Sequence, residues 1–197
     1  MRSYLQFQKN QAQVHARKRT EHLKDIRQDP SGAWSYEGKW MVCTLPDGRR
    51  RRVTVFLWGL LALAACCIIL CGCLQGTGME GCFYVLLPYA SGVFALCFSI
   101  RHLLAVTSGK GRMWEYQYEK HVPGLSVSLA WGFLSCLLCV SGRIAEAAGS
   151  GGWESAGMMG AAKSGPVFLG LQAATAVLFL AGFFLQKKLT WELSESE

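Results

Sequence analysis

The chain has 197 residues, and 51% of them are apolar. A mean hydropathy of +0.22 is high for a soluble domain, so the composition favours a membrane protein over a soluble enzyme. The formal net charge of +7 does not require a nucleic-acid partner, because basic segments beside membrane helices are attracted to anionic lipid head groups. We therefore expect the lipid bilayer, and no nucleic acid, as the partner of the basic residues.

The N-terminal segment, residues 1–29, is rich in basic and helix-forming residues, with apolar residues at loose helical spacing. Asp29 and Pro30 end any helix at this point, because the residue before a proline is biased away from the helical conformation. The sequence predicts a basic N-terminal helix over 1–29 that either rests on the membrane surface or is solvated.

Residues 30–52 have the composition of extended chain. Their strand-forming residues lie on even-numbered positions, namely Trp34, Tyr36, Trp40 and Val42. The stretch "PDG" at 46–48 is a turn signal between two extended segments. The pattern predicts a β-hairpin over 30–52 on the cytoplasmic side of the membrane.

Four apolar runs are each long enough to cross the ~30 Å hydrocarbon layer as a helix, at a rise of ~1.5 Å per residue. They cover residues 53–74, 82–104, 124–142 and 166–186. Pro88 lies inside the second run and predicts a kink there. The expected fold is an all-α membrane protein, a four-transmembrane-helix bundle over 53–186 with a small head of helix and hairpin. The first two spans are expected to be neighbours, because the connection between them is short.

Between the second and third spans, residues 113–120 alternate aromatic with polar side chains. Such alternation is typical of a half-buried strand. Because a single strand is not stable alone, we expect a small sheet that pairs this strand with the hairpin of the head. If that sheet forms, an acidic residue in place of Tyr116 should destabilise the head. The alternative is that the aromatic residues only anchor the chain at the membrane interface.

The flanking charges predict the orientation. Of the 20 lysines and arginines, only Arg143 and Lys163 lie in segments between the first and second or the third and fourth spans. By the positive-inside rule, both termini, including the tail at 187–197, are expected in the cytoplasm. The expected location is the plasma (inner) membrane of a bacterium, as a multi-pass protein.

Polar residues inside the spans are few, and none of the interiors carries an ionisable group except thiols. An ion-coupled transporter is therefore not expected. Gln172, Thr175, Ser128 and Ser135 are expected to form hydrogen bonds between helices. Close helix packing is predicted at pairs of small residues four positions apart, namely Ser128 with Gly132, Gly132 with Cys136, and Gly170 with Ala174.

Cysteines are the chemical feature of this sequence, with four of the nine in "CCIILCGC" at 66–73. At about 100° per residue, Cys67 and Cys71 share one helix face, and Cys66 and Cys73 share another. Because the first and third spans run in the same direction, Cys136 and Cys139 are expected at the depth of Cys67 and Cys71. A four-thiolate metal site is conceivable there, but the absence of nearby polar groups favours packing thiols, and no metal or cofactor is expected.

A C-x-x-C pair, Cys136 and Cys139, lies near the outer end of the third span, and a second outer pair, Cys73 and Cys82, flanks the short outer loop. In outline the chain resembles the quinone-linked disulfide-forming enzymes and vitamin K epoxide reductase. The resemblance implies redox roles for Cys136, Cys139, Cys73 and Cys82. The loop is also short enough for Cys73 and Cys82 to form a disulfide, with Cys71 as another partner for Cys82, although reduced thiols are the expected state.

No HExxH, GxSxG or paired-acid motif is present in the chain. The favoured function is a non-catalytic interaction or accessory subunit that binds a membrane protein partner or a second copy of itself. One alternative is a quinone-linked membrane thiol-disulfide oxidoreductase. A further alternative is a permease subunit that needs a partner chain to supply its polar pathway.

Overall fold

The computed structural model of the chain describes residues 26–28, 34–36, 39–74, 83–109, 111–149 and 164–194. Within these residues the fold is mostly helical. The helices are α2 (Asp47–Cys73), α3 (Phe83–Ser108), α4 (Glu115–Gly149) and α5 (Ser164–Gln186). The strands are β1 (Ile26–Gln28), β2 (Trp34–Tyr36), β3 (Trp40–Cys43), β4 (Arg112–Trp114) and β5 (Trp191–Ser194).

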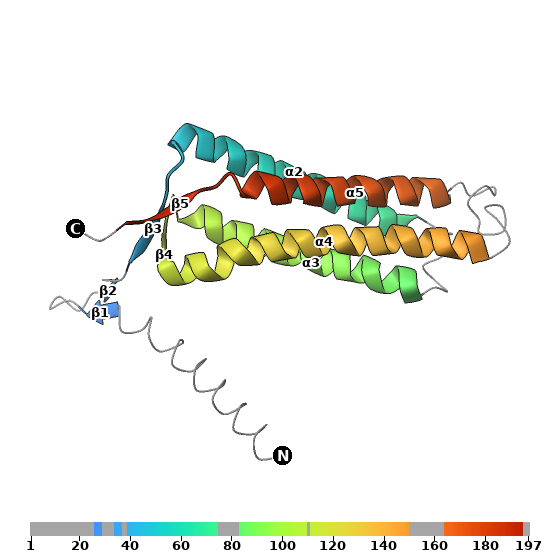
Figure 1. The fold of residues 1–197 in the computed structure, drawn as a ribbon, viewed down its shortest axis with the longest axis horizontal. Helices are drawn as coiled ribbons and strands as arrows, with labels where there is room; N and C mark the ends of the chain where they lie inside the picture. Colours follow the sequence, from blue (N-terminus) through green and yellow to red (C-terminus); the bar gives the residue numbers. More distant parts are fainter. Residues whose placement is uncertain are drawn as a thin grey trace, which may run out of the picture.

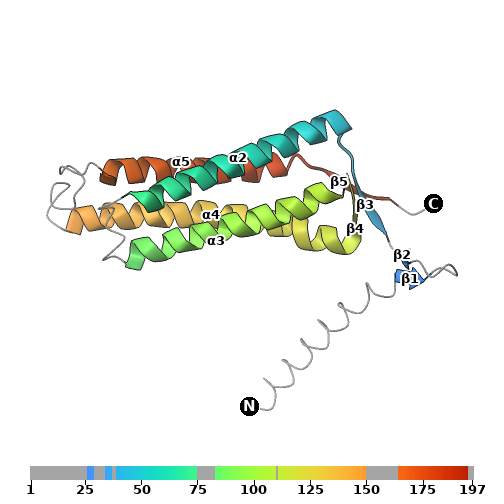
Figure 2. The same ribbon diagram turned by 180° about the vertical axis from the view of Figure 1, so that it is seen from behind.

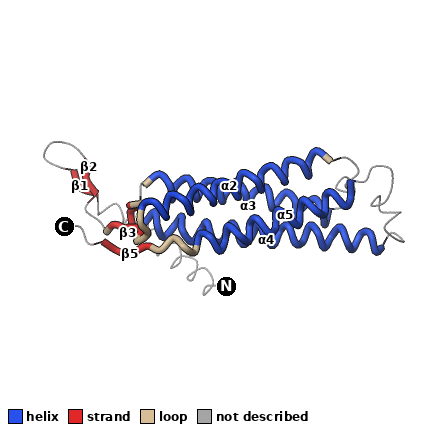
Figure 3. Tube along the Cα trace, turned by 90° about the horizontal axis from the view of Figure 1, so that it is seen from above, coloured by secondary structure: helices blue, strands red, loops and turns tan. Residues whose placement is uncertain are grey.

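All four described helices are long and apolar enough to cross a membrane, which confirms the predicted number of long apolar helices. The helices lie side by side as an elongated bundle, and β3, β4 and β5 gather at the end where α2 and α4 begin (Figures 1 and 2). We call this end the sheet end and the other the far end. The view from above places the strands beyond the helices along the bundle axis (Figure 3).

The packing of the helices does not follow chain order. Helix α3 packs along α4, α2 packs along α5, and α4 also packs against α5. The consecutive helices α2 and α3 share the least contact of these pairs, so the expectation that the first two spans are close neighbours is only partly met. They are joined by a hydrogen bond in which Tyr89 Oη donates to the Ile68 carbonyl at 2.8 Å. A short connection brings two helix ends together, but it does not determine which faces of the two helices pack against each other.

The predicted hairpin over 30–52 is wrong for its second half. Helix α2 begins at Asp47, and the N–H groups of Arg49 and Arg50 both donate to the Pro46 carbonyl at 2.9 Å. Pro46 has extended backbone angles before the first turn, and the acidic Asp47 favours a helix N-terminus. The stretch "PDG" therefore begins a helix and does not connect two strands.

The predicted N-terminal helix over 1–29 is also wrong where it can be compared. Residues 26–28 form β1, which pairs antiparallel with β2 and places Ile26 opposite Tyr36. Residues 1–25 lie outside the described residues.

A second sheet has the strand order β4-β3-β5, with both pairings antiparallel. The pairing of β3 with β4 confirms the expected link between the head and the segment after the second span. The third strand, β5, comes from the predicted tail at 187–197 and pairs Cys43 with Trp191. Three segments that are distant in the sequence are thus joined at the sheet end.

The predicted strand over 113–120 is correct only at its start. Strand β4 ends at Trp114, and α4 begins at Glu115, whose N–H donates to the Lys39 carbonyl at 3.2 Å. The partner strand β3 begins at Trp40, which pairs with Trp114, so β3 offers no pairing to the residues that follow Trp114. Unpaired backbone groups are better satisfied in a helix, and an acidic residue suits its first turn.

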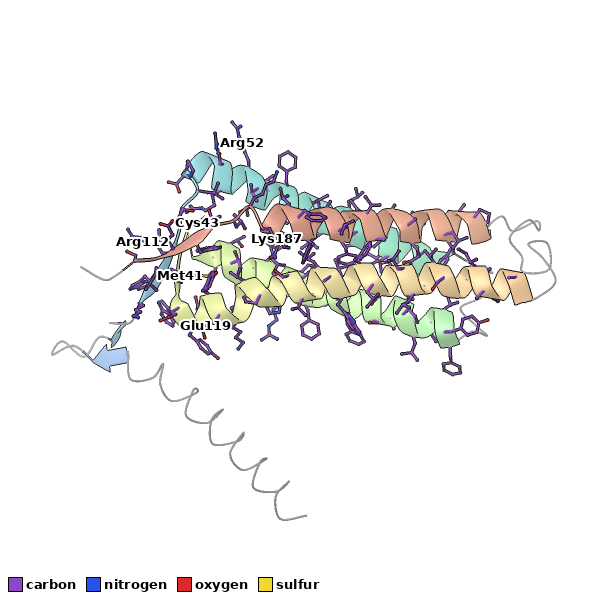
Figure 4. All side chains as sticks on the ribbon, in the orientation of Figure 1. Met41, Cys43, Arg52, Arg112, Glu119 and Lys187 are labelled. Atoms are coloured by element: carbon purple, nitrogen blue, oxygen red, sulfur yellow. The ribbon has the colours of Figure 1, made fainter. Side chains whose placement is uncertain are left out.

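The alternation pattern placed Tyr116 and Tyr118 on one buried face, but only Tyr118 is packed there, and it is partly buried. Tyr118 packs against the cluster of Met41, Val106 and Met113, and its ring centroid lies 6.1 Å from that of Trp191. Tyr116 is exposed on the first turn of α4. Figure 4 shows Met41 and Cys43 between the strands and the helices.

We expect Tyr118→Asp to destabilise the sheet end by ~2 kcal/mol or more, because it places a carboxylate among apolar side chains. The measurement is the rate of limited proteolysis between residues 39 and 45 in detergent. Tyr116→Asp is the matched control and should be cut at the parent rate. Equal cleavage of the two variants would contradict this packing.

Polar groups inside the bundle join helices as expected for the serines. Ser99 Oγ donates to Ser128 Oγ at 2.9 Å, and Ser91 and Ser135 share a hydrogen bond of 3.1 Å, both between α3 and α4. Thr175 differs from the prediction, since its hydroxyl donates to the Leu171 carbonyl of its own helix at 2.7 Å. Most polar side chains of the interior thus have structural roles.

Glycine packing is confirmed at one of the predicted positions and wrong at another. A β-carbon on Gly132 would lie 2.7 Å from a ring carbon of the buried Phe179, so α4 and α5 approach closely there. A β-carbon on Gly170 would meet nothing within 4 Å. At Gly142 a β-carbon would lie 2.9 Å from the Tyr84 carbonyl oxygen, so α3 and α4 also approach closely there. In a regular helix the N–H of residue 88 would donate to this carbonyl, but Pro88 has no N–H.

Candidate functional site

Three buried thiols lie in the core of the bundle toward its far end. Cys71 comes from α2, and Cys136 and Cys139 come from α4; all three are buried. Cys71 and Cys139 belong to one buried cluster, and Cys136 lies about one turn before Cys139 on α4. The expectation that Cys71 and the C-x-x-C pair lie at the same depth is therefore confirmed. We call these three residues the thiol cluster.

Helix geometry explains which thiols of "CCIILCGC" reach the cluster. Cys67 and Cys71 are buried, whereas Cys66 and Cys73 are exposed, as the shared faces predicted. Cys73 is two residues after Cys71 and therefore about 200° further around the helix. The structure brings Cys71, and not Cys73, beside the C-x-x-C pair. Cys82 lies outside the described residues, so a bond between Cys73 and Cys82 stays a prediction.

The surroundings of the thiol cluster are apolar with two polar neighbours. Val85 and Phe168 are fully buried in the same hydrophobic cluster as Cys71 and Cys139. Cys139 Sγ lies 3.6 Å from the Val85 carbonyl, to which it donates a weak hydrogen bond. Gln172 contacts Cys71, and its Nε2 has no hydrogen-bond partner among the described residues. All three cysteines are free thiols, so joining two of them in a disulfide would need a two-electron oxidant before any exchange with the third could occur.

No group of three or more histidine, cysteine or acidic side chains in the described part of the chain is arranged to hold a metal ion. The three sulfur atoms of the thiol cluster come from two helices. They are not close enough together to surround one metal ion, because the ligands of an ion must converge on it.

Arg143 is the residue of the interior that the sequence analysis missed. It was assigned to an outer loop, but α4 continues to Gly149 and Arg143 is only 1% exposed. Its Nη1 forms an ion pair with Glu146 Oε2, one turn further along α4. Arg143 lies four residues, about one turn, after Cys139 on α4. The i, i+3 spacing of opposite charges directly after an apolar run was the signal available in the sequence.

Two histidines meet nearer the sheet end. The Nδ1 atoms of His102 and His121 lie 3.1 Å apart, and the ring centroids are 5.3 Å apart. Gly124 makes room for this pair, because a β-carbon there would lie 2.5 Å from His102 Cε1. The positive charges of Arg101 and Lys120 act on both rings of the pair. One imidazole must donate and the other accept, so at least one ring is neutral while the bond is made.

The described residues therefore contain three polar features inside or beside the bundle, namely the thiol cluster, the Arg143–Glu146 pair and the histidine pair. The chain matches no protein-family model, no curated protein and no solved structure.

Proposed function

We propose that this chain is a non-catalytic accessory subunit that inserts its four helices into a membrane and presents the sheet end to a partner. The observation that carries the proposal is the three-stranded sheet, whose strands come from before α2, between α3 and α4, and after α5. Such a sheet ties the sheet ends of all four helices into one rigid surface outside the apolar spans. A rigid surface reduces the entropy that a partner must overcome on binding.

The sheet has two different faces, because successive side chains of a strand alternate. Met41 and Met113 pack toward α3 with Val106. Trp40 and Trp114 therefore lie on the opposite face, turned away from the bundle, with ring centroids 6.4 Å apart in an edge-to-face arrangement. Tryptophan is enriched among the residues that dominate binding energy at protein interfaces. This Trp40–Trp114 face is the surface proposed to meet the partner, which is another membrane protein or a second copy of the chain.

Mass measurement of the complex extracted in mild detergent tests the accessory role. We expect the parent to be recovered with a membrane protein partner or a second copy at fixed stoichiometry, and Trp114→Ala to lose it. Trp131→Ala is the matched control, since Trp131 is an exposed tryptophan on the surface of the spans. Recovery of the parent alone, as a monomer, would contradict the proposal.

The orientation follows from charge. The lysines and arginines of the described helices, apart from Arg143, lie within about two turns of the sheet end. By the positive-inside rule this distribution supports a cytoplasmic sheet end, with both termini in the cytoplasm of a bacterial cell and the spans in its plasma membrane.

We expect single cysteines placed in a cysteine-free variant to report this orientation. A cysteine in place of Gln117, near the sheet end, should be protected from a membrane-impermeant maleimide in intact cells. A cysteine in the segment 150–160 should be labelled. Permeabilised cells are the control, in which both positions should react. The reverse pattern in intact cells would contradict the cytoplasmic assignment of the sheet end.

The thiol cluster favours a second candidate, the membrane thiol-disulfide oxidoreductase. A third thiol beside a C-x-x-C pair is the arrangement that disulfide exchange needs, because one thiolate attacks a disulfide formed by the other two. In this version Cys71 takes the part that the sequence analysis assigned to Cys73 and Cys82. A permease role stays a prediction that depends on a partner chain.

Trapping of the thiols distinguishes the two candidates. For an accessory subunit we expect Cys71, Cys136 and Cys139 all to be alkylated under denaturing conditions without reductant, since buried thiols without an oxidant stay reduced. Mass spectrometry of the peptides measures the modification. Cys97, which is exposed on α3, serves as the internal control for complete alkylation. A disulfide among the three that forms on addition of quinone would favour the oxidoreductase instead.

A further inference from the structure

A basic pocket lies at the sheet end, where the first turns of α2 meet the end of α3 and the start of β5. Its volume is about 310 Å³, in the lower part of the range typical of small-molecule sites. The lining combines charged, hydroxyl and apolar side chains. They come from Asp47, Arg50, Arg51, Thr54, Val106, Thr107, Gly111, Leu189 and Trp191.

Arg50 is held in place at this pocket by two contacts. Its Nη2 lies 3.1 Å from Asp47 Oδ1, in an ion pair across one turn of α2. Its guanidinium lies over Gly111, where a β-carbon would collide with Nη1. Gly111 has a φ of +92°, a conformation that glycine adopts without strain. A guanidinium fixed by its neighbours loses less entropy when it binds an anion.

The other polar groups of the pocket are donors or a second positive charge. Arg51 gives the lining two arginines against the single carboxylate of Asp47. The indole Nε1 of Trp191 is buried without a hydrogen-bond partner among the described residues. A buried N–H left without an acceptor costs about 1–3 kcal/mol, so an acceptor in the pocket would remove that cost. Thr54 adds a hydroxyl group.

The pocket also lies at a defined depth. The apolar run of α2 begins at Val53, directly after the four arginines at 49–52, so Arg50 and Arg51 stand where a membrane helix would meet the head-group layer. Basic pockets between membrane helices at this level are suited to anionic head groups.

We propose that this pocket binds a phosphate group, either the phosphodiester of an anionic phospholipid or a free phosphate compound. Arg50 and Arg51 pair with the phosphate oxygens, and Trp191 Nε1 donates to one of them. The lipid source rests on the membrane insertion proposed above, whereas the free-phosphate source does not.

The test compares two double variants that remove the same charge from one run of arginines. Arg50→Gln/Arg51→Gln alters the pocket, and Arg49→Gln/Arg52→Gln alters two exposed arginines that do not line it. Figure 4 shows Arg52 on the outer side of α2. Native mass spectrometry in a non-ionic detergent measures binding of phosphatidylglycerol and of phosphatidylcholine. A titration with inorganic phosphate, followed by thermal shift, forms the free-anion arm.

We expect the pocket variant to bind phosphatidylglycerol at least about tenfold more weakly than the parent, since charge-assisted hydrogen bonds are lost. The Arg49/Arg52 variant should stay near the parent affinity, and phosphatidylcholine should bind weakly to all forms. Trp191→Phe removes the indole donor with little change of shape and should also weaken binding. This second variant keeps the proposal testable if the Arg50/Arg51 double variant misfolds. If the thermal shift with phosphate depends on the pocket while lipid binding does not, the free compound is the ligand.

Equal loss in the two double variants would show general attraction of charge and overturn the proposal. Sodium carbonate extraction of membranes tests insertion separately, so a failed insertion and an empty pocket give different results.

Discussion

Glu146→Gln is expected to reduce the stability of the bundle by about 3–5 kcal/mol, the range found when one partner of a buried ion pair is removed. Arg143 is 1% exposed and Glu146 is 21% exposed, so the guanidinium is the member that water cannot reach. Glutamine keeps the size of the side chain but removes the negative charge that faces Arg143 Nη1. Thermal unfolding in detergent measures the loss.

Removal of the other partner should have a smaller effect, and this asymmetry makes the prediction specific. Arg143→Met places an apolar side chain of similar length in the buried position and leaves a partly exposed carboxylate that water can solvate. The double variant Arg143→Met/Glu146→Gln should recover most of the stability lost in Glu146→Gln, because no buried charge remains. If Glu146→Gln alone unfolds at the parent temperature, the ion pair does not stabilise the bundle.

Gly132→Ala should destabilise the contact between α4 and α5 by about 1–3 kcal/mol through overpacking. The added β-carbon would lie 2.7, 2.8 and 2.9 Å from three ring carbons of Phe179. Phe179 is fully buried, so its ring has no free space into which it can move. The helices must therefore separate, and the gain in helix propensity from alanine is too small to compensate.

Gly170→Ala is the matched control, since it makes the same change in a helix where the β-carbon meets nothing within 4 Å. It should unfold at the parent temperature or slightly above it. Phe179→Leu in the Gly132→Ala background should restore part of the stability by vacating the space of the ring. An equal effect of the two alanine substitutions would mean that helix propensity, and not the Phe179 contact, controls stability at these positions.

Sequence alone was sufficient for the helices of the bundle, because the signal for a membrane span is local. A run of about 20 apolar residues satisfies its own backbone hydrogen bonds as a helix, whatever its neighbours are. The same local geometry correctly placed Cys67 with Cys71 on one helix face and Cys66 with Cys73 on another, and the structure shows that the first face is buried and the second exposed. Helical periodicity assigns residues to faces before any partner is known.

Local sequence patterns gave wrong predictions where the same pattern suits two different local structures. Proline, aspartate and glycine at 46–48 suit both a turn and a helix start, and the structure has a helix because the partners of β3 are β4 and β5. The alternation at 113–120 suited a strand, but pairing with β3 ends at Trp114 and only backbone pairing keeps a strand extended. Gly132 and Gly170 look alike in the sequence, yet only Gly132 faces a large side chain.

The amino-acid sequence by itself determined the number of long apolar helices, their apolar character and the charge asymmetry between the two ends, since each depends on composition within one segment. Tertiary structure alone decided which features meet: Cys71 with the C-x-x-C pair, Arg143 in the interior, and Arg50 with Trp191 around one pocket. These contacts join segments far apart in the chain. They depend on which helix faces pack together, and that choice minimises the free energy of the whole bundle, not of any one segment.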